Sequence, residues 1–154
     1  MNETTSLLDI MPILQQLFIA VGLGFVIGVE RELAHRAAGV RTHSLVSLGD
    51  ALFSIMSTEM VGAGGDQTIA PSIVSGIGFL GAGLIIFHGN KLQGLTTAAG
   101  IWVAAAIGMA VGFKLYALAI VATILTIGIF AVLYPIEHRF ISRIANNNGN
   151  SKED

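Results

Sequence analysis

The stretch GLTTAAGIWVAAAIGMAVG, residues 94–112, contains no charged side chain and is long enough to cross a lipid bilayer as one helix. Within it, Gly100, Ala104, Gly108 and Gly112 recur at intervals of four residues. That spacing places them on one helix face, where no side chain is larger than a methyl group. Helices in lipid associate by close packing, which small residues permit. The stretch therefore predicts a membrane helix that packs tightly against its neighbours.

The composition of the whole chain agrees with a membrane protein. Of its 154 residues, 53% are hydrophobic and 12% are charged, whereas a soluble domain has about 25% charged residues. The net charge of −2 provides no basic surface for nucleic acid. No cysteine is present, which excludes disulfides and thiolate chemistry and leaves the redox compartment open. The first apolar run lacks preceding Lys or Arg, so we expect it to remain as a span.

Five apolar segments follow one another, each near the ~20 residues that a helix needs to cross a bilayer core. They cover residues 12–29, 43–62, 71–87, 95–112 and 116–134. Pro12 and Pro71 lie at expected helix starts, where a missing N–H costs nothing. The sequence thus predicts an all-α, polytopic membrane helix bundle with about five transmembrane helices.

The distribution of basic residues predicts the orientation of this bundle. If the N-terminus lies outside, seven of the eight Lys and Arg residues fall inside, and only Lys114 falls outside. The expected topology is therefore N-out and C-in. We expect one transmembrane domain over residues 1–135, followed over 136–154 by an interfacial helix extension and a disordered cytoplasmic tail.

Glycines elsewhere in the spans leave two readings open. The first segment has Gly24 and Gly28, and the third has Gly76, Gly78, Gly81 and Gly83. They either allow helix packing or mark a broken or re-entrant helix that exposes backbone to a solute. The literal G-x-G-x-x-G at residues 76–81 lies inside an apolar span, so it does not predict nucleotide binding. No other catalytic motif occurs, and we expect neither an enzyme nor a cofactor.

Polar residues of the second segment share one helix face. At 100° per residue, an arc of about 100° contains five of them. This polar seam consists of His43, Ser47, Asp50, Ser54 and Ser57. An ionisable group at membrane depth is costly and usually has a purpose. Asp50 is either hydrogen-bonded to serines or a neighbouring Arg, or it senses a proton or cation.

Glu59 lies on the opposite face of the same segment from Asp50. Two carboxylates on opposite faces cannot share one site, which argues against a paired-carboxylate metal site in this helix. Which metal, if any, the chain binds stays open.

A charged hairpin joins the first two segments. Glu30, Arg31 and Glu32 close the first segment, and Arg41 and Thr42 begin the second. We expect a Glu30–Arg41 ion pair, with Arg31 and Glu32 left for partners or lipid headgroups. The hairpin is then either an orienting anchor or a working site.

Four blocks carry a resemblance to a known family. They are GFVIGVERE (24–32), AGVRTHSLVSLG (38–49), IVSGIGFLGAGLI (73–85) and GLTTAAGIWVAAAIGMAVG (94–112). In this order they resemble the MgtC/SapB family of bacterial inner-membrane proteins. The resemblance implies a five-span, multi-pass protein of the inner membrane, tied to stress adaptation, virulence and growth in low magnesium. It further implies regulation of other membrane machinery, such as ATP synthase or ion pumps.

The resemblance also assigns residues to motifs. The charged-loop motif is matched by Glu30, Arg31, Glu32, Gly39, Arg41 and Thr42. The glycine motif is matched by Gly76, Gly78, Gly81 and Gly83, and the following one by residues 95–98. Asp50 stands where the family pattern has a small residue. Longer members carry a soluble C-terminal domain resembling an ACT fold, and we expect a short form without it.

Three functions remain open from the sequence. The leading one is a non-enzymatic regulator whose charged hairpin and glycine faces dock the helices of another membrane protein. The rival is a cation transporter or channel, magnesium-linked, with the Asp50 seam as its path and broken backbone at residues 76–83 as its filter. A purely structural bundle is the third. The expected partners are the lipid bilayer and other membrane proteins, and the small-residue faces also permit a homo-oligomer.

Overall fold

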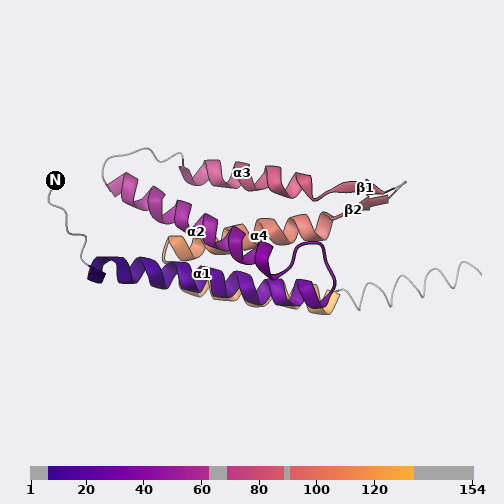
Figure 1. Cartoon of the computed structure of the whole chain (residues 1–154), viewed down its shortest axis with the longest axis horizontal. Coiled ribbons are helices and arrows are strands. Elements are labelled where there is room, and N and C mark those ends of the chain that lie inside the picture. Colours follow the sequence, from indigo (N-terminus) through magenta and orange to yellow (C-terminus); the bar gives the residue numbers. More distant parts are fainter. Residues whose placement is uncertain (1–6, 63–68, 89–90, 134–154) are drawn as a thin grey trace, which may run out of the picture.

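The structure is a computed structural model that describes residues 7–62, 69–88 and 91–133. These residues form five α-helices and one short β-hairpin, which confirms the all-α fold (Figure 1). The helices are α1 (Leu7–Leu33), α2 (Val40–Gly62), α3 (Ile69–Gly83), α4 (Leu95–Gly112) and α5 (Tyr116–Gly128). A π-helical turn over Ile129–Leu133 continues α5. The hairpin pairs β1 (Ile86–His88) with antiparallel β2 (Lys91–Gln93).

Consecutive helices run in opposite directions along one long axis (Figure 1). The α1–α2 connection and the β-hairpin lie at the same end of the bundle. The described chain therefore enters α1 at one end and leaves α5 at the other, as five antiparallel passes require. Which end faces the cytoplasm stays a prediction.

The described helices turn large apolar side chains outward. Phe79 is 82% exposed and Phe18 is 72% exposed, and many other exposed residues are Leu, Ile or Val. Such a surface suits lipid, because water would penalise so much apolar area. Within the described residues, three helical segments are long and apolar enough to cross a membrane: Ile10–Leu33, Leu95–Gly112 and Tyr116–Leu133. The apolar part of α3, Pro71–Gly83, is shorter, and α2 is set apart by its polar face.

The polar seam of α2 lies at the centre of the bundle. All five of its residues are buried: His43, Ser47, Asp50, Ser54 and Ser57. Glu59 is exposed, as its place on the opposite face predicts. The seam is thus covered by protein, which is how polar side chains are tolerated at membrane depth.

Glycines bring the neighbouring helices onto α2. On α1, a Cβ added at Gly24 would lie 2.6 Å from the His43 carbonyl oxygen, and one at Gly28 would overlap the backbone of Val40. On α4, a Cβ at Gly108 would overlap the Ser47 carbonyl oxygen. Because real Cβ atoms do not approach so closely, only glycine permits these helix–helix distances.

Gly112 and Gly100 extend this contact along α4. A Cβ at Gly112 would lie 2.5 Å from Ser54 Cβ, and one at Gly100 would lie 2.9 Å from the Phe130 ring. The α4 stripe therefore contacts α2 near one end and the turn after α5 near the other.

The glycines of α3 behave differently from those of α1 and α4. Nothing lies within 4 Å of a Cβ added at Gly76, Gly78 or Gly83, and Gly81 approaches only Ala98, at 3.9 Å. The helix also runs unbroken from Ile69 to Gly83. Within this protein, these glycines neither break the helix nor pack closely. The reason is that α3 contacts α4 through Ile77, which lies with Ile101 and Ala105 in a small apolar cluster.

Several predicted bounds shift. The first helix begins at Leu7, so Pro12 lies inside it rather than at its start. The third segment ends its helix at Gly83 and turns into the β-hairpin, where the sequence predicted continued helix to Phe87. Gly94, between β2 and α4, has a φ of 92°, and a Cβ added there would overlap the Leu84 carbonyl oxygen. The predicted tail over 136–154 and the end of the fifth segment lie outside the described residues.

The Gly108 contact makes a prediction about stability. We expect Gly108→Ala to lower the free energy of unfolding by about 1–3 kcal/mol, the usual penalty of overpacking a close contact. Detergent-mixture unfolding followed by circular dichroism measures it.

Gly22→Ala is the matched control, because nothing lies within 4 Å of a Cβ there. It should be neutral or stabilising by up to about 1 kcal/mol, since alanine favours helix over glycine. Equal effects of the two changes would contradict the glycine-packing account.

Candidate functional site

The ends of α1 and α4 are fixed by the same backbone motif. After α1, the N–H of Arg36 donates to the Arg31 carbonyl and that of His35 to the Glu32 carbonyl, both at 3.0 Å. His35 takes the left-handed conformation, with φ of 54°, that this motif requires. Lys114 takes the same position after α4, with φ of 62°. The first of these motifs turns the chain so that α2 starts directly beside the end of α1.

Arg31 lies near the end of α1, and its side chain is in the protein interior instead of on the surface of the α1–α2 connection. Its side chain is 3% exposed, and Nη1 lies 3.5 Å from Glu30 Oε2. Its guanidinium carbon lies 4.0 Å from the centre of the Phe130 ring, a cation–π contact. Since Phe130 belongs to the turn that follows α5, Arg31 ties the last described turn of the chain to the first helix.

His43 completes this buried group. It is fully buried, and Nδ1 lies 3.0 Å from the Gly39 carbonyl oxygen. A Cβ at Gly100 would lie 3.5 Å from His43 Nε2, and the Phe130 ring lies beside the same glycine. We call Glu30, Arg31, His43 and Phe130 the charged cluster.

Unsatisfied polar atoms concentrate in the charged cluster. Among the described residues, four buried side-chain atoms lack a hydrogen-bond partner. They are Glu30 Oε2, Arg31 Nε, His43 Nε2 and Ser44 Oγ. Buried polar groups are nearly always hydrogen-bonded, so these four atoms are exceptions to a general rule. Three of the four belong to the charged cluster.

The structure corrects the predicted roles of the hairpin charges. Glu30 pairs with Arg31 and not with Arg41, which lies exposed at the start of α2. Arg31 and Glu32 were expected to remain available to partners or headgroups. Arg31 is buried instead. Glu32 stays exposed, and its Oε2 also accepts a 2.9 Å hydrogen bond from the Val40 N–H at the start of α2.

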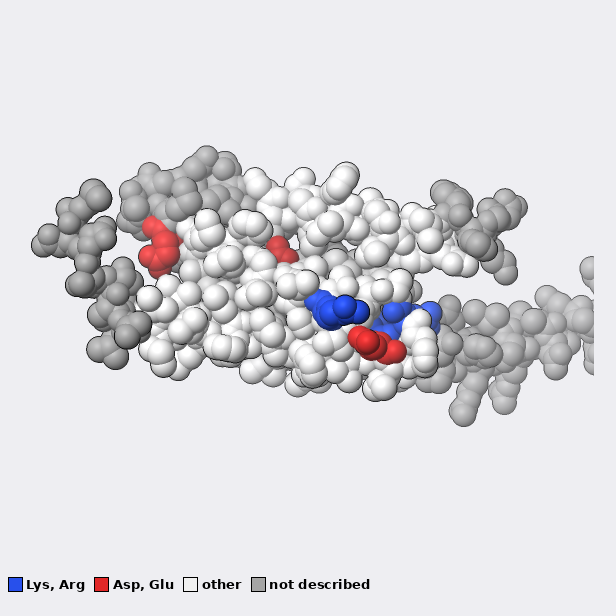
Figure 2. Space-filling view, in the orientation of Figure 1, with Lys and Arg blue, Asp and Glu red and all other residues white. Residues whose placement is uncertain are grey.

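The exposed charges of the hairpin lie at one end of the bundle. Figure 2 shows basic side chains over the α1–α2 connection, with an acidic side chain beside them. Arg41 and Thr42 are both exposed there. With Glu32, which is also exposed, they are the members of the predicted charged hairpin that a partner could reach directly.

The serines of the seam are used within the protein. Ser47 Oγ donates to the Ala20 carbonyl of α1 at 2.8 Å, and Ser54 Oγ donates to the main-chain carbonyl of Asp50 at 2.7 Å. Gly108 and Gly112 press against the same two serines. This part of the seam therefore has neither free hydroxyls nor room for a hydrated ion.

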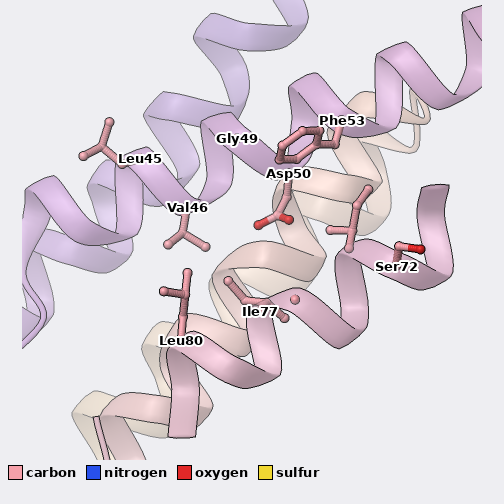
Figure 3. Close-up of a pocket in the computed structure, with 10 residues that line it drawn as sticks. Leu45, Val46, Gly49, Asp50, Phe53, Ser72, Ile77 and Leu80 are labelled. Atoms are coloured by element: carbon pink, nitrogen blue, oxygen red, sulfur yellow. The ribbon is translucent and has the colours of Figure 1, made fainter. Parts of the chain in front are cut away.

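Asp50 differs from the serines because its carboxylate points into a groove between α2 and α3 (Figure 3). The groove has a volume of about 590 Å³. Its lining is Leu45, Val46, Gly49, Asp50 and Phe53 from α2, and Ser72, Ile73, Gly76, Ile77 and Leu80 from α3. Within the described residues, no hydrogen bond or ion pair reaches this carboxylate. The expectation that serines or a neighbouring Arg would bond it is therefore wrong.

Sequence reasoning missed two parts of this site. Phe130 carries no pattern that links it to Arg31, because the two residues are far apart in sequence. The α3 wall of the groove was also missed, since nothing in the third segment indicates which of its faces meets α2. Within the described ranges, no group of three or more His, Cys, Asp or Glu side chains could hold a metal ion.

Comparison with known proteins gives one family. The model of the MgtC family matches residues 17–139. Protein MgtC of Brucella abortus (strain 2308) is 46% identical over 114 residues, which are 74% of this chain and 48% of that protein. Protein MgtC of Salmonella typhimurium (strain LT2) is 44% identical over 114 residues, 74% of this chain and 49% of that protein.

A third relative is the Escherichia coli (strain K12) protein named "Putative magnesium transporter YhiD". It is 37% identical over 140 residues, 85% of this chain and 64% of that protein. The chain thus spans about half the length of the MgtC proteins it matches. No solved structure matches it.

The charged cluster predicts that Arg31 is structural as well as charged. We expect Arg31→Gln to lower the free energy of unfolding by about 2 kcal/mol or more, because it leaves Glu30 without its partner and removes the contact with Phe130. Arg41→Gln is the matched control and should change it by less than about 0.5 kcal/mol, since Arg41 is exposed. Unfolding of both variants in mixed micelles decides this, and equal stabilities would contradict the cluster.

Proposed function

The chain belongs to the MgtC family, as its motifs predicted, and from this we propose that it is a non-enzymatic regulator of other membrane proteins. We place it in the bacterial inner membrane as a multi-pass protein that serves adaptation to low magnesium or host stress. In this proposal its partners are membrane machines such as ATP synthase or ion pumps.

The observation that carries the proposal is the closed seam of α2. A transport path needs a continuous polar surface open to water or to an ion. Here Ser47 and Ser54 donate hydrogen bonds to backbone carbonyls, and the α4 backbone at Gly108 and Gly112 packs directly against them. A bundle sealed in this way is better suited to presenting a fixed surface than to passing a solute.

The end of the bundle near the α1–α2 connection offers such a surface. Leu33 is 75% exposed and Leu45 is 67% exposed, and Arg41 lies exposed between them in sequence. Apolar side chains beside a cation suit a partner at the membrane interface, where aliphatic and charged groups meet. The buried cluster behind this surface holds α1, α2 and the end of α5 together.

Co-purification tests the regulator. We expect the full chain, extracted in mild detergent from magnesium-starved cells, to bring a defined membrane complex with it. Arg41→Glu should reduce that recovery by about tenfold, since reversing one interfacial charge makes an attraction repulsive.

Lys114→Glu is the matched control, because Lys114 is an exposed cation in the turn between α4 and α5. It should leave recovery unchanged. Recovery that is lost in both variants, or in neither, would contradict a partner surface at the hairpin.

A second candidate function is a cation transporter, magnesium-linked. One observation favours it: Asp50 places an unpaired carboxylate in the groove between α2 and α3. The name of the E. coli relative points the same way. The sealed seam beside Asp50 argues against it.

Liposome flux separates the two functions. We expect purified protein in liposomes to give no Mg²⁺ entry above that of empty vesicles, measured with an entrapped magnesium indicator. Saturable entry that Asp50→Asn abolishes would establish the transporter instead.

A further inference from the structure

We propose that the groove between α2 and α3 binds a lipophilic organic monocation, a molecule with one positive centre inside an apolar body. This site goes beyond the regulatory role proposed above and does not depend on it.

The floor of the groove supplies the charge. Asp50 is 6% exposed, and its carboxylate points into the groove toward α3 (Figure 3). No described residue donates a hydrogen bond to it or forms an ion pair with it. A carboxylate withdrawn from water without a partner is costly, so a cation that reaches it gains an interaction that water does not offset.

The walls of the groove supply the apolar contact. Apart from Asp50 and Ser72, the lining is aliphatic, aromatic or glycine. The volume of about 590 Å³ lies within the ~300–1,000 Å³ of small-molecule sites. Gly49 and Gly76 keep the space open, because no atom would lie within 4 Å of a Cβ at either position.

The same lining disfavours an inorganic cation. Mg²⁺ requires near-octahedral oxygen ligands and keeps several of its waters. This groove provides one carboxylate among apolar side chains, and the described residues contain no cluster of metal-ligating groups. A dehydrated ion would lack ligands there. A hydrated ion would place its water molecules against apolar side chains, which cannot hydrogen-bond to them.

Access is available from the lipid side. Phe53 and Leu80 line the groove and are about half exposed on the apolar outer surface. A lipophilic cation that partitions into the bilayer therefore meets the groove without crossing the bundle. Electrostatic attraction to the buried carboxylate then selects it over neutral molecules of the same shape.

The test uses tetraphenylphosphonium and its anionic counterpart of the same shape, tetraphenylborate. Binding to the full chain in lipid nanodiscs is measured by equilibrium dialysis, with empty nanodiscs as the partition background. We expect saturable binding of one tetraphenylphosphonium per chain and no saturable binding of tetraphenylborate. Asp50→Asn should weaken the cation by about tenfold or more, because it removes the charge and preserves the shape.

A second pair of variants tests the place of binding independently of the charge. Gly76→Leu projects into the groove and should abolish binding. Gly78→Leu is the matched control, since Gly78 has equal space around it but does not line the groove. It should bind like the unaltered protein. Thermal unfolding of each variant in the same nanodiscs confirms the fold.

Four results would overturn the proposal. They are uptake no greater than that of empty nanodiscs, unchanged affinity in Asp50→Asn, unchanged affinity in Gly76→Leu, and displacement by millimolar MgCl₂ beyond that by NaCl of equal ionic strength. The last would make the groove an inorganic-cation site. None of these results bears on co-purification with a membrane complex, so this proposal and the regulatory one can fail separately.

Discussion

The structure depends on the direct contact of the polar face of α2 with the backbones of α1 and α4. A serine hydroxyl at membrane depth needs an acceptor, and the nearest acceptors on another helix are its main-chain carbonyls. Ser47 reaches such a carbonyl at Ala20, which requires α1 to lie very close to α2. Gly24 and Gly108 permit this closeness from the two sides. The hydrogen bonds of the polar seam and the close contacts of the glycine faces therefore require each other.

That interaction also determines what is left outside it. With α1 and α4 occupying most of the seam, α3 approaches α2 less closely, and the groove in front of Asp50 remains between them. At the end of the bundle that carries the α1–α2 connection, the buried Arg31 of α1 makes a cation–π contact with Phe130, in the turn after α5. The result is a sealed centre, one groove open toward lipid, and an exposed interfacial end that carries Arg41. The functional proposals follow from these three surfaces.

Features within a single helix could be predicted from the sequence, and contacts between helices mostly could not. The seam and the α4 stripe follow from helical spacing alone, so the burial of the seam and the exposure of Glu59 were foreseeable. The ion-pair partner of Glu30 was not foreseeable. The placement of charges at the ends of the first two segments favoured Arg41, but in the structure Glu30 pairs with the buried Arg31. Both α3 and α4 are rich in glycine, yet only packing distinguishes an open glycine such as Gly76 from a contact glycine such as Gly108. The β-hairpin that follows the third segment was not predicted; Gly94, which comes directly after β2, has a positive φ.

Accessibility of single cysteines tests the sealed seam most directly, since the chain contains no cysteine of its own. Ser47→Cys, Ser54→Cys and, as an exposed reference, Thr42→Cys are treated in permeabilised cells with a charged methanethiosulfonate that cannot enter lipid. We expect Thr42→Cys to react readily, whereas the two seam cysteines should react only after denaturation in SDS. Reaction of Ser47→Cys in native membranes at the rate of Thr42→Cys would show a water-filled path along α2 and contradict the account.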